Sequence, residues 1–291
     1  MSVGLLTPEA VAQAYKNACL TELQALKPGN VHVFADGHGM TVYDFIKSAD
    51  ASAAVIAQAG VSVGERIGHA VKATQAAVGM NTNLGLILLA APLVHAALAT
   101  NAHLGLTSAV TQVLNTLSDE DGRLAAQAIL LANPAGLGRV ASHDVHAPAK
   151  VNLGLMMASA ADRDRIAWQY AHAFADIFNL GLPCYLAAKQ RWQEQAKNDS
   201  DAWAASAVYL AFLAHYEDSH ILRKFGVGVA AQVKREAQAI EAKYRQAHHP
   251  KLMQKELLAW DASLKQRHIN PGSSADLTVA CLLAANLQRL S

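Results

Sequence analysis

An all-α fold is the fold class that the sequence predicts, and three observations predict it. The chain is rich in alanine, and 52% of its 291 residues are hydrophobic whereas only 16% are charged. It contains no run of alternating β-branched and aromatic residues bounded by hairpin turns. Helix start signals, in contrast, recur along the whole sequence. We therefore expect one globular bundle of roughly a dozen helices, in a single domain that spans residues 1–291.

The first third of the chain contains four expected helices. Thr7 and Pro8 are typical of an N-cap followed by proline at the first helical position, and this helix should end before Lys27-Pro28-Gly29-Asn30. The next two are expected from Thr41 to about Gly60 and over residues 64–78. The polar segment 79–85 then begins the most apolar run, residues 84–99, which is too short for a comfortable membrane span and predicts a buried helix.

Start signals continue through the rest of the chain. Thr107 and Ser118-x-x-Asp121 should open two helices, and residues 133–150, with their glycines and prolines, predict a long functional loop. Ser159-x-x-Asp162 should cap a helix that ends at Leu180. The remaining helices are expected over residues 183–197, 200–215, 227–247, 250–266 and 273–290.

Composition excludes several classes of protein. A net charge of +1 offers no basic excess for nucleic acid. Three widely spaced cysteines in apolar contexts, with no CxxC pair, favour reduced core residues of a cytoplasmic protein. The start of the chain lacks the basic and apolar regions of a signal peptide, so neither export nor membrane attachment is expected.

Polar residues interrupt this apolar chain in four clusters, which we expect to converge on one cleft. They are Glu22 with residues 27–32, residues 81–83, residues 215–224 and residues 270–276. Each cluster also has a plain interpretation as a helix cap or a solvated charged turn. In the last cluster, Ser273 and Asp276 match a capping box, and the free N–H groups of such a helix start favour an anion.

His143-Asp144-x-His146 raises a second class of function, because helical metal-dependent phosphohydrolases use a His-Asp pair. Here the pair lies in the expected loop and is followed by Pro148, which favours a substrate-contacting role for His143 and Asp144 over a metal site. A third class, a non-catalytic helical binding protein, predicts instead that the four polar clusters lie apart on the surface.

Five motifs, in one order and spacing, carry a resemblance that covers nearly the whole chain. They are Glu22 with KPGNV (27–31), the stretch 38–48, GMNTNLG (79–85), DSHILRKFG (218–226) and NPGSSADL (270–277). Together they resemble the triphosphoribosyl-dephospho-CoA synthase family, whose members are all-helical. The resemblance implies a transferase that joins ATP to 3′-dephospho-CoA and releases adenine.

The resemblance also implies roles for particular residues. Cleavage at C1′ of a ribose passes through an oxocarbenium-like transition state that carboxylates stabilise, and a triphosphate requires Mg²⁺. Asp218, Asp276 and Glu22 are the expected catalytic acids and shared Mg²⁺ ligands. The expected substrate-binding residues are Lys27, Asn30, Asn81, Thr82, Asn83, His143, Asp144, His220, Arg223, Lys224, Ser273 and Ser274. The expected partners are two small molecules: ATP or a related nucleotide, and dephospho-CoA or another cofactor precursor. A homodimer is a further possible assembly.

Two departures from the family pattern affect the expected substrate. The family's asparagine-threonine motif continues with histidine and lysine, whereas this chain has Asn83-Leu84. A Gly-Ala-Arg-Gly-Glu-like segment is replaced by residues 136–148. A divergent branch with these features is associated with tetrahydromethanopterin and methanofuran biosynthesis, and the missing lysine favours that branch.

Overall fold

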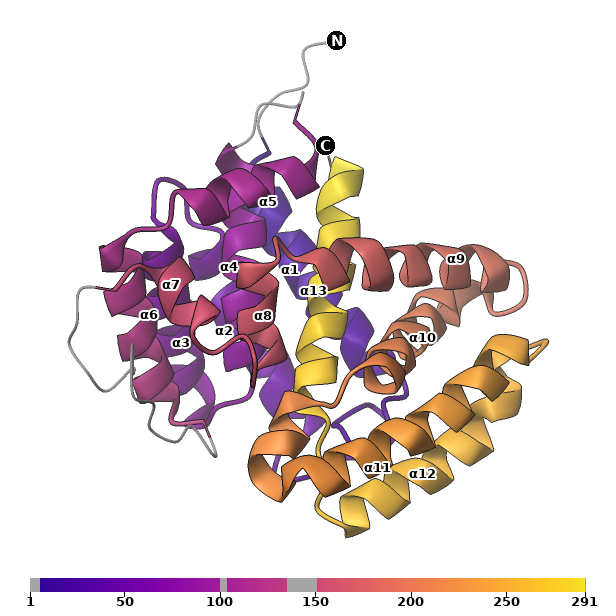
Figure 1. Cartoon of the computed structure of the whole chain (residues 1–291). Coiled ribbons are helices and arrows are strands. Elements are labelled where there is room, and N and C mark those ends of the chain that lie inside the picture. The colour runs from indigo at the N-terminus through magenta and orange to yellow at the C-terminus, as the bar shows by residue number, and fades with distance from the viewer. Residues whose placement is uncertain (1–5, 100–103, 135–150, 291) are drawn as a thin grey trace. The chain divides into compact units, whose positions relative to one another are not determined.

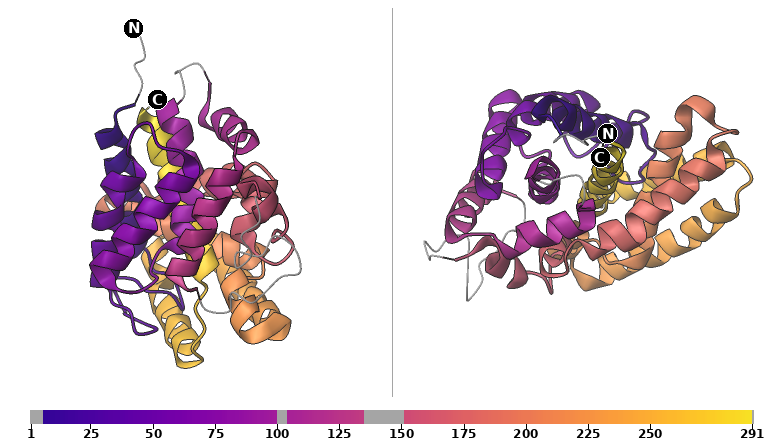
Figure 2. Two further views of the ribbon diagram at one scale, coloured as in Figure 1. Left: turned by 90° about the vertical axis from the view of Figure 1, so that its left-hand side faces the viewer. Right: turned by 90° about the horizontal axis from the view of Figure 1, so that it is seen from above.

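The computed structural model describes residues 6–99, 104–134 and 151–290. In these residues the regular structure consists of thirteen α-helices with short 3₁₀ and π segments, and it contains no strand (Figures 1 and 2). The predicted all-α fold class is confirmed. The helices are α1 (Pro8–Gln24), α2 (Val42–Ile56), α3 (Val63–Val78), α4 (Leu84–Ala99), α5 (Leu106–Asn115), α6 (Asp119–Ala132), α7 (Leu153–Ala158), α8 (Arg165–Ala171), α9 (Leu182–Trp192), α10 (Ser200–His215), α11 (Ser219–Gln246), α12 (Gln254–Gln266) and α13 (Gly272–Leu290).

The chain forms two compact units, and each is built from segments that are distant in sequence. The first unit consists of Met1–Ala18, Asp44–Ala175 and Leu283–Ser291. The second consists of Cys19–Tyr43 and Asp176–Leu282. The expectation of a single domain over residues 1–291 stays a prediction.

Helix α4 is the apolar centre of the first unit, as its sequence predicts. It packs against α3, α5 and α8. Pro92 lies inside it and has no N–H, so the carbonyl of Leu88, four residues earlier, loses its helical partner. The hydroxyl of Tyr170 on α8 donates to that carbonyl at 2.6 Å. The proline that interrupts one helix therefore creates the acceptor that anchors another.

Two predicted helix starts in the first unit are confirmed, with reciprocal capping boxes at Ser62–Glu65 and Ser118–Asp121. Asp121 has a further function, because its Oδ1 accepts the N–H of Gly64 at 2.7 Å. A Cβ on Gly64 would lie 2.5 Å from the Cα of Asp121. The start of α6 and the start of α3 can approach this closely only because residue 64 is glycine.

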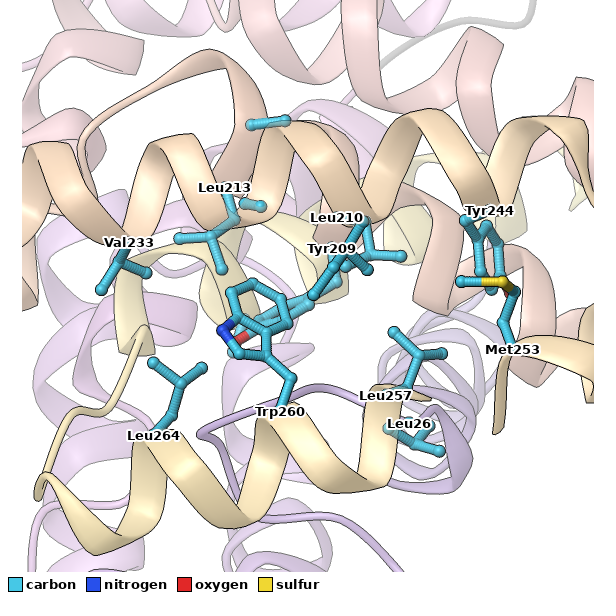
Figure 3. Close-up of a cluster of buried hydrophobic side chains, with 14 of the residues drawn as sticks. Leu26, Tyr209, Leu210, Leu213, Val233, Tyr244, Met253, Leu257, Trp260 and Leu264 are labelled. Atoms are coloured by element: carbon cyan, nitrogen blue, oxygen red, sulfur yellow. The ribbon is translucent and has the colours of Figure 1, made fainter. Parts of the chain in front are cut away.

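A hydrophobic cluster of α10, α11 and α12 holds the second unit together. Figure 3 shows Leu257, Trp260 and Leu264 projecting from α12 toward the side chains of α10 and α11. The spacing of these three residues places them on one face of α12. Leu26, from the turn after α1, joins the same cluster and is 1% exposed. The polar segment that follows Leu26 is thereby fixed against the core of this unit.

One predicted helix, from Ser159 to Leu180, is wrong. Ser159 ends α7 instead, and its hydroxyl donates to the carbonyl of Met156 at 2.7 Å. The cap of the next helix is Asp164, whose Oδ1 accepts the N–H groups of residues 166 and 167. Helix α8 ends at Ala171, because Ala173 and Phe174 both adopt positive φ, and a π-helical segment covers Ile177–Gly181. A serine hydroxyl can donate a hydrogen bond to a backbone carbonyl as well as accept one from an N–H group, so a Ser-x-x-Asp pattern alone does not specify a helix start.

Two further helix boundaries differ from expectation. The helix expected to start at 227 is preceded by one to two turns that begin after Asp218, and Gly226 (φ 81°, ψ 175°) separates the two parts of α11. Helix α13 begins at Gly272 rather than after an N-cap at Ser273. The expected helices over residues 200–215 and 84–99 have the predicted bounds.

Candidate functional site

The segment Lys27-Pro28-Gly29-Asn30 forms a tight turn in the second unit. The N–H of Asn30 donates to the carbonyl of Lys27 at 3.0 Å, and Gly29 has a φ of 84°. Proline at the second position and a positive-φ glycine at the third are the requirements of a type II β-turn. A Cβ on Gly29 would lie 2.8 Å from Cδ of Pro271, so the turn packs directly against the segment before α13.

Lys27 and Glu22 form a buried ion pair beside this turn. Lys27 is 1% exposed and its ammonium contacts a carboxylate oxygen of Glu22. It also donates to Oδ1 of Asn30 at 2.9 Å, and the amide of Asn30 donates to Oδ1 of Asn270 at 2.8 Å. The first and last of the four polar clusters therefore meet, although 240 positions separate Asn30 from Asn270.

Burial dominates the electrostatics of this pair. It raises the pKa of Glu22, against the lowering effect of Lys27. It lowers the pKa of Lys27, against the raising effects of Glu22 and, more weakly, of Asp276. The influence of Asp276 places that carboxylate in the electrostatic surroundings of the turn. Asp276 itself is the fifth residue of α13 and is partly exposed.

The central peptide of the turn, between Pro28 and Gly29, is held on both sides. The hydroxyl of Tyr209 donates to the carbonyl of Pro28 at 2.7 Å. The N–H of Gly29 donates to Oδ1 of Asp261 at 2.8 Å. Both Tyr209 and Asp261 are buried, and burial raises the pKa of the Tyr209 hydroxyl, with Asp218, Asp261 and Glu22 adding to the effect. Tyr209 is therefore a neutral hydrogen-bond donor.

Asp218 joins the starts of two helices. Its Oδ1 accepts the N–H groups of His220 at 2.9 Å and of Ile221 at 3.2 Å, which caps α11. Its Oδ2 accepts the N–H and the hydroxyl of Ser274 on α13, at 2.7 and 2.8 Å. Asp218 is 3% exposed. The third and fourth polar clusters thus meet through this carboxylate.

Cationic side chains lie around the same helix starts. Arg223 is half-buried and Lys224 is exposed. Burial lowers the pKa of His220, with Arg223, Lys224 and His38 acting in the same direction and Asp218 against them. His220 also lies against the start of α13, since a Cβ on Gly272 would be 2.9 Å from its Nδ1. The substrate-binding roles expected of His220, Arg223 and Lys224 stay predictions.

The cluster Asn81-Thr82-Asn83 belongs to the first unit. Asn81 accepts the N–H of Leu84 at 3.1 Å, and the hydroxyls of Thr82 and Ser48 are 2.6 Å apart. Asn81 and Asn83 line a small pocket, with room for about one water molecule, together with Thr74. The capping interpretation of Asn81 is confirmed, and its substrate-binding role stays a prediction. His143 and Asp144 lie outside the described residues.

The shared Mg²⁺ site expected on Glu22, Asp218 and Asp276 also stays a prediction. Among the residues that the structure describes, no group of three or more histidine, cysteine, aspartate or glutamate side chains is arranged to hold a metal ion. Glu22 is paired with Lys27, and both oxygens of Asp218 accept hydrogen bonds. These two acids do not fit a three-carboxylate cage. Mg²⁺ commonly takes only one or two carboxylates and completes its shell with substrate phosphates and water.

Sequence reasoning missed Asp261 and Tyr209. Asp261 lies on the buried face of α12, one residue after Trp260 and three before Leu264. A carboxylate on an apolar stripe needs buried partners, and this signal was available in the sequence. Tyr209 carries no such signal, because a tyrosine among the apolar residues of α10 is ordinarily part of a core.

A sequence model of one protein family, described as ATP:dephospho-CoA triphosphoribosyl transferase, matches residues 8–291. The chain belongs to this family. No curated protein matches the chain significantly. Among solved structures, a "putative triphosphoribosyl-dephospho-coA synthase" from Archaeoglobus fulgidus is similar, with a TM-score of 0.59 and 20% sequence identity over 86% of this chain and 100% of that chain. At that identity the likeness shows the fold alone.

Membership of the ATP:dephospho-CoA triphosphoribosyl transferase family confirms the predicted family and the prediction of a transferase. The non-catalytic binding protein considered from the sequence is thereby wrong. Its expectation of separate surface clusters also fails in the second unit, where Asn30 binds Asn270 and Asp218 binds Ser274. No helix in the described parts of the chain is both long and apolar enough to cross a membrane.

Proposed function

We propose that this chain transfers the triphosphoribosyl group of ATP to 3′-dephospho-CoA and releases adenine. The observation that carries the proposal is the family match over residues 8–291. Neither the matching family nor the similar solved structure is described by a tetrahydromethanopterin or methanofuran pathway, so the family's own reaction is preferred over that alternative. The phosphohydrolase alternative depends on His143 and Asp144 and has no support in the described residues.

In this reaction the bond between C1′ of the ATP ribose and the adenine nitrogen breaks. A bond forms between C1′ and a ribose hydroxyl oxygen of dephospho-CoA. The hydroxyl loses its proton to a base, and adenine takes up a proton as it leaves. The transition state carries positive charge on the sugar, which a carboxylate stabilises.

Asp276 is the carboxylate that we assign to this role. It is partly exposed on α13, as a carboxylate that contacts the substrate must be, whereas Glu22 and Asp218 are only 5% and 3% exposed. Glu22 and Asp218 are therefore assigned to holding Lys27 and the two helix starts in place. Mg²⁺, when bound to Asp276 and the triphosphate, would neutralise phosphate charge.

Arg223 and Lys224 are assigned to the phosphates. Both follow the cap at Asp218, and Lys224 is exposed beside the glycine break of α11. A guanidinium and an ammonium are the groups that bind phosphate oxygens most strongly. Lys27 is 1% exposed and faces Glu22 and Asn30, so its proposed contribution is to the shape of the turn.

The test is to incubate the protein with Mg²⁺ and ATP, with and without dephospho-CoA, and to quantify adenine and the coupled product by mass spectrometry. Adenine that forms only with dephospho-CoA supports the proposal, and nucleotide binding without any adenine overturns it. Asp276→Asn should lower turnover at least about 100-fold. Asp50→Asn, which removes an exposed partner of Lys16 in the first unit, should leave turnover unchanged.

A further inference from the structure

Asp261, which no family motif considered above contains, holds the turn beside the Glu22–Lys27 pair. We propose that Asp261 is a positioning residue of the transferase: it fixes the orientation of the Pro28–Gly29 peptide and, through it, Lys27 and Asn30. The kinetic part of this inference rests on the proposed function, whereas its structural part does not.

The carboxylate of Asp261 is fully committed to protein groups. Oδ1 accepts the N–H of Gly29 at 2.8 Å and lies 3.3 Å from Nε2 of His32. Oδ2 accepts the ammonium of Lys265 at 3.0 Å, and that ammonium also donates to the carbonyl of Ala35 at 2.9 Å. Asp261 is 3% exposed, so it has no open side for a substrate. From α12, the carboxylate therefore holds Gly29 directly and Ala35 through the ammonium of Lys265.

His32 lies against the Asp261 carboxylate in its neutral form. Its Nδ1 accepts the N–H of Phe34 at 3.3 Å, which leaves the ring proton on Nε2, facing Asp261. His32 is completely buried, and this burial lowers its pKa although Asp261 raises it. Burial raises the pKa of Asp261, but the neighbouring His32, the Gly29 N–H and the Lys265 ammonium together bring it below its usual value. The anionic form of Asp261 is thus favoured, and both of its oxygens have fixed partners.

The orientation of the Pro28–Gly29 peptide is what Asp261 controls. Type I and type II turns differ in the direction of this central peptide. Tyr209 holds its carbonyl and Asp261 holds its N–H, so both groups enforce the same orientation. The next residue, Asn30, binds both Lys27 and Asn270. A rotated peptide would therefore displace the contacts that connect the turn to the segment preceding α13.

The experiment compares Asp261→Ala and Asp261→Asn with Glu236→Gln. The alanine variant removes the acceptor of the Gly29 N–H, whereas the asparagine variant keeps one acceptor oxygen and loses the charge that balances Lys265. Glu236 on α11 accepts bonds from Trp260 and Arg267, so its variant also loosens an attachment of α12 but leaves the turn intact. Each protein is assayed for hydrogen–deuterium exchange of peptides that cover residues 25–35, and for kcat and KM of adenine release.

Exchange in residues 25–35 should be fastest in Asp261→Ala, intermediate in Asp261→Asn and unchanged in Glu236→Gln. The value of kcat should fall in the same order, at least about tenfold for the alanine variant, while KM changes less than about threefold. Unchanged exchange, or increased exchange with the wild-type kcat, overturns the proposal. So does an asparagine variant no better than the alanine variant, because that result would assign the effect to charge alone. If the unmodified protein releases no adenine, the proposed reaction has failed, and the exchange measurement still decides whether Asp261 fixes the turn.

Discussion

Replacing Lys27 by methionine should destabilise the second unit severely. Lys27 and Glu22 have side-chain exposures of 1% and 6%, so the substitution leaves an uncompensated buried carboxylate. Removing one partner of such a pair costs about 3–5 kcal/mol. A domain is commonly stable by only about 5–15 kcal/mol. With a urea dependence of about 2–3 kcal/mol per molar, the unfolding midpoint should fall by about 1–2.5 M.

Urea unfolding followed by circular dichroism at pH 7.5 measures this effect. The double variant Lys27→Met/Glu22→Gln removes both charges and should recover at least half of the lost free energy, because no buried charge remains. Lys16→Met is the matched control, since Lys16 pairs with Asp50 at side-chain exposures of 37% and 49% and should cost less than about 1 kcal/mol. A Lys27→Met variant as stable as Lys16→Met, or a double variant worse than either single one, would refute the reasoning.

Gly29→Ala should lower the free energy of unfolding by at least about 2 kcal/mol, because φ is 84° and the added Cβ would lie 2.8 Å from Cδ of Pro271. Gly39→Ala, at φ 76° with open space around it, should lower the free energy of unfolding by only about 1 kcal/mol. Equal losses in the Gly29 and Gly39 variants would rule out the close packing of the Gly29 turn. Asp121→Ala should lower the free energy of unfolding by about 2–3 kcal/mol, because it removes both a capping box and the acceptor of the Gly64 N–H. A calorimetric loss below about 0.5 kcal/mol would contradict this prediction. Stability should fall as pH drops below about 6.5, because burial lowers the pKa of several histidines in the folded state and the unfolded chain then binds more protons. These histidines are His32, His38, His95 and His220. A urea midpoint that is equal at pH 7.5 and pH 5.5 would contradict the last prediction.

Much of the fold could be predicted because its signals are local. The capping box at Ser118 and the long apolar run of α4 specify their helices within a few residues. The helix expected from Ser159 failed because a serine can close a helix as well as open one, and the choice depends on residues that pack against it. The division into two units could not be predicted, since each unit joins segments that are distant in sequence.

The candidate site was predicted in outline but not in its partners. The polar clusters at 22–30 and 270–276 do meet, which an apolar chain with few polar residues favours. The metal-binding role expected of Asp218 stays a prediction, but the sequence did not indicate that its carboxylate accepts hydrogen bonds from four protein donors. That arrangement depends on the placement of Ser274, 56 positions later, and no local pattern reports it. For Asp261, the apolar stripe of α12 does indicate a buried carboxylate, but nothing local identifies its partner Gly29, which lies 232 positions away.

The double cap at Asp218 has a consequence for how sequences in this region can diverge. Asparagine or serine would serve either α11 or α13 alone, since each is an adequate cap for one helix. Neither offers two equivalent acceptor oxygens on opposite sides of one planar group. Either substitution therefore leaves one of the two helix starts without its acceptor, and a compensating change at that helix start would be needed to restore it.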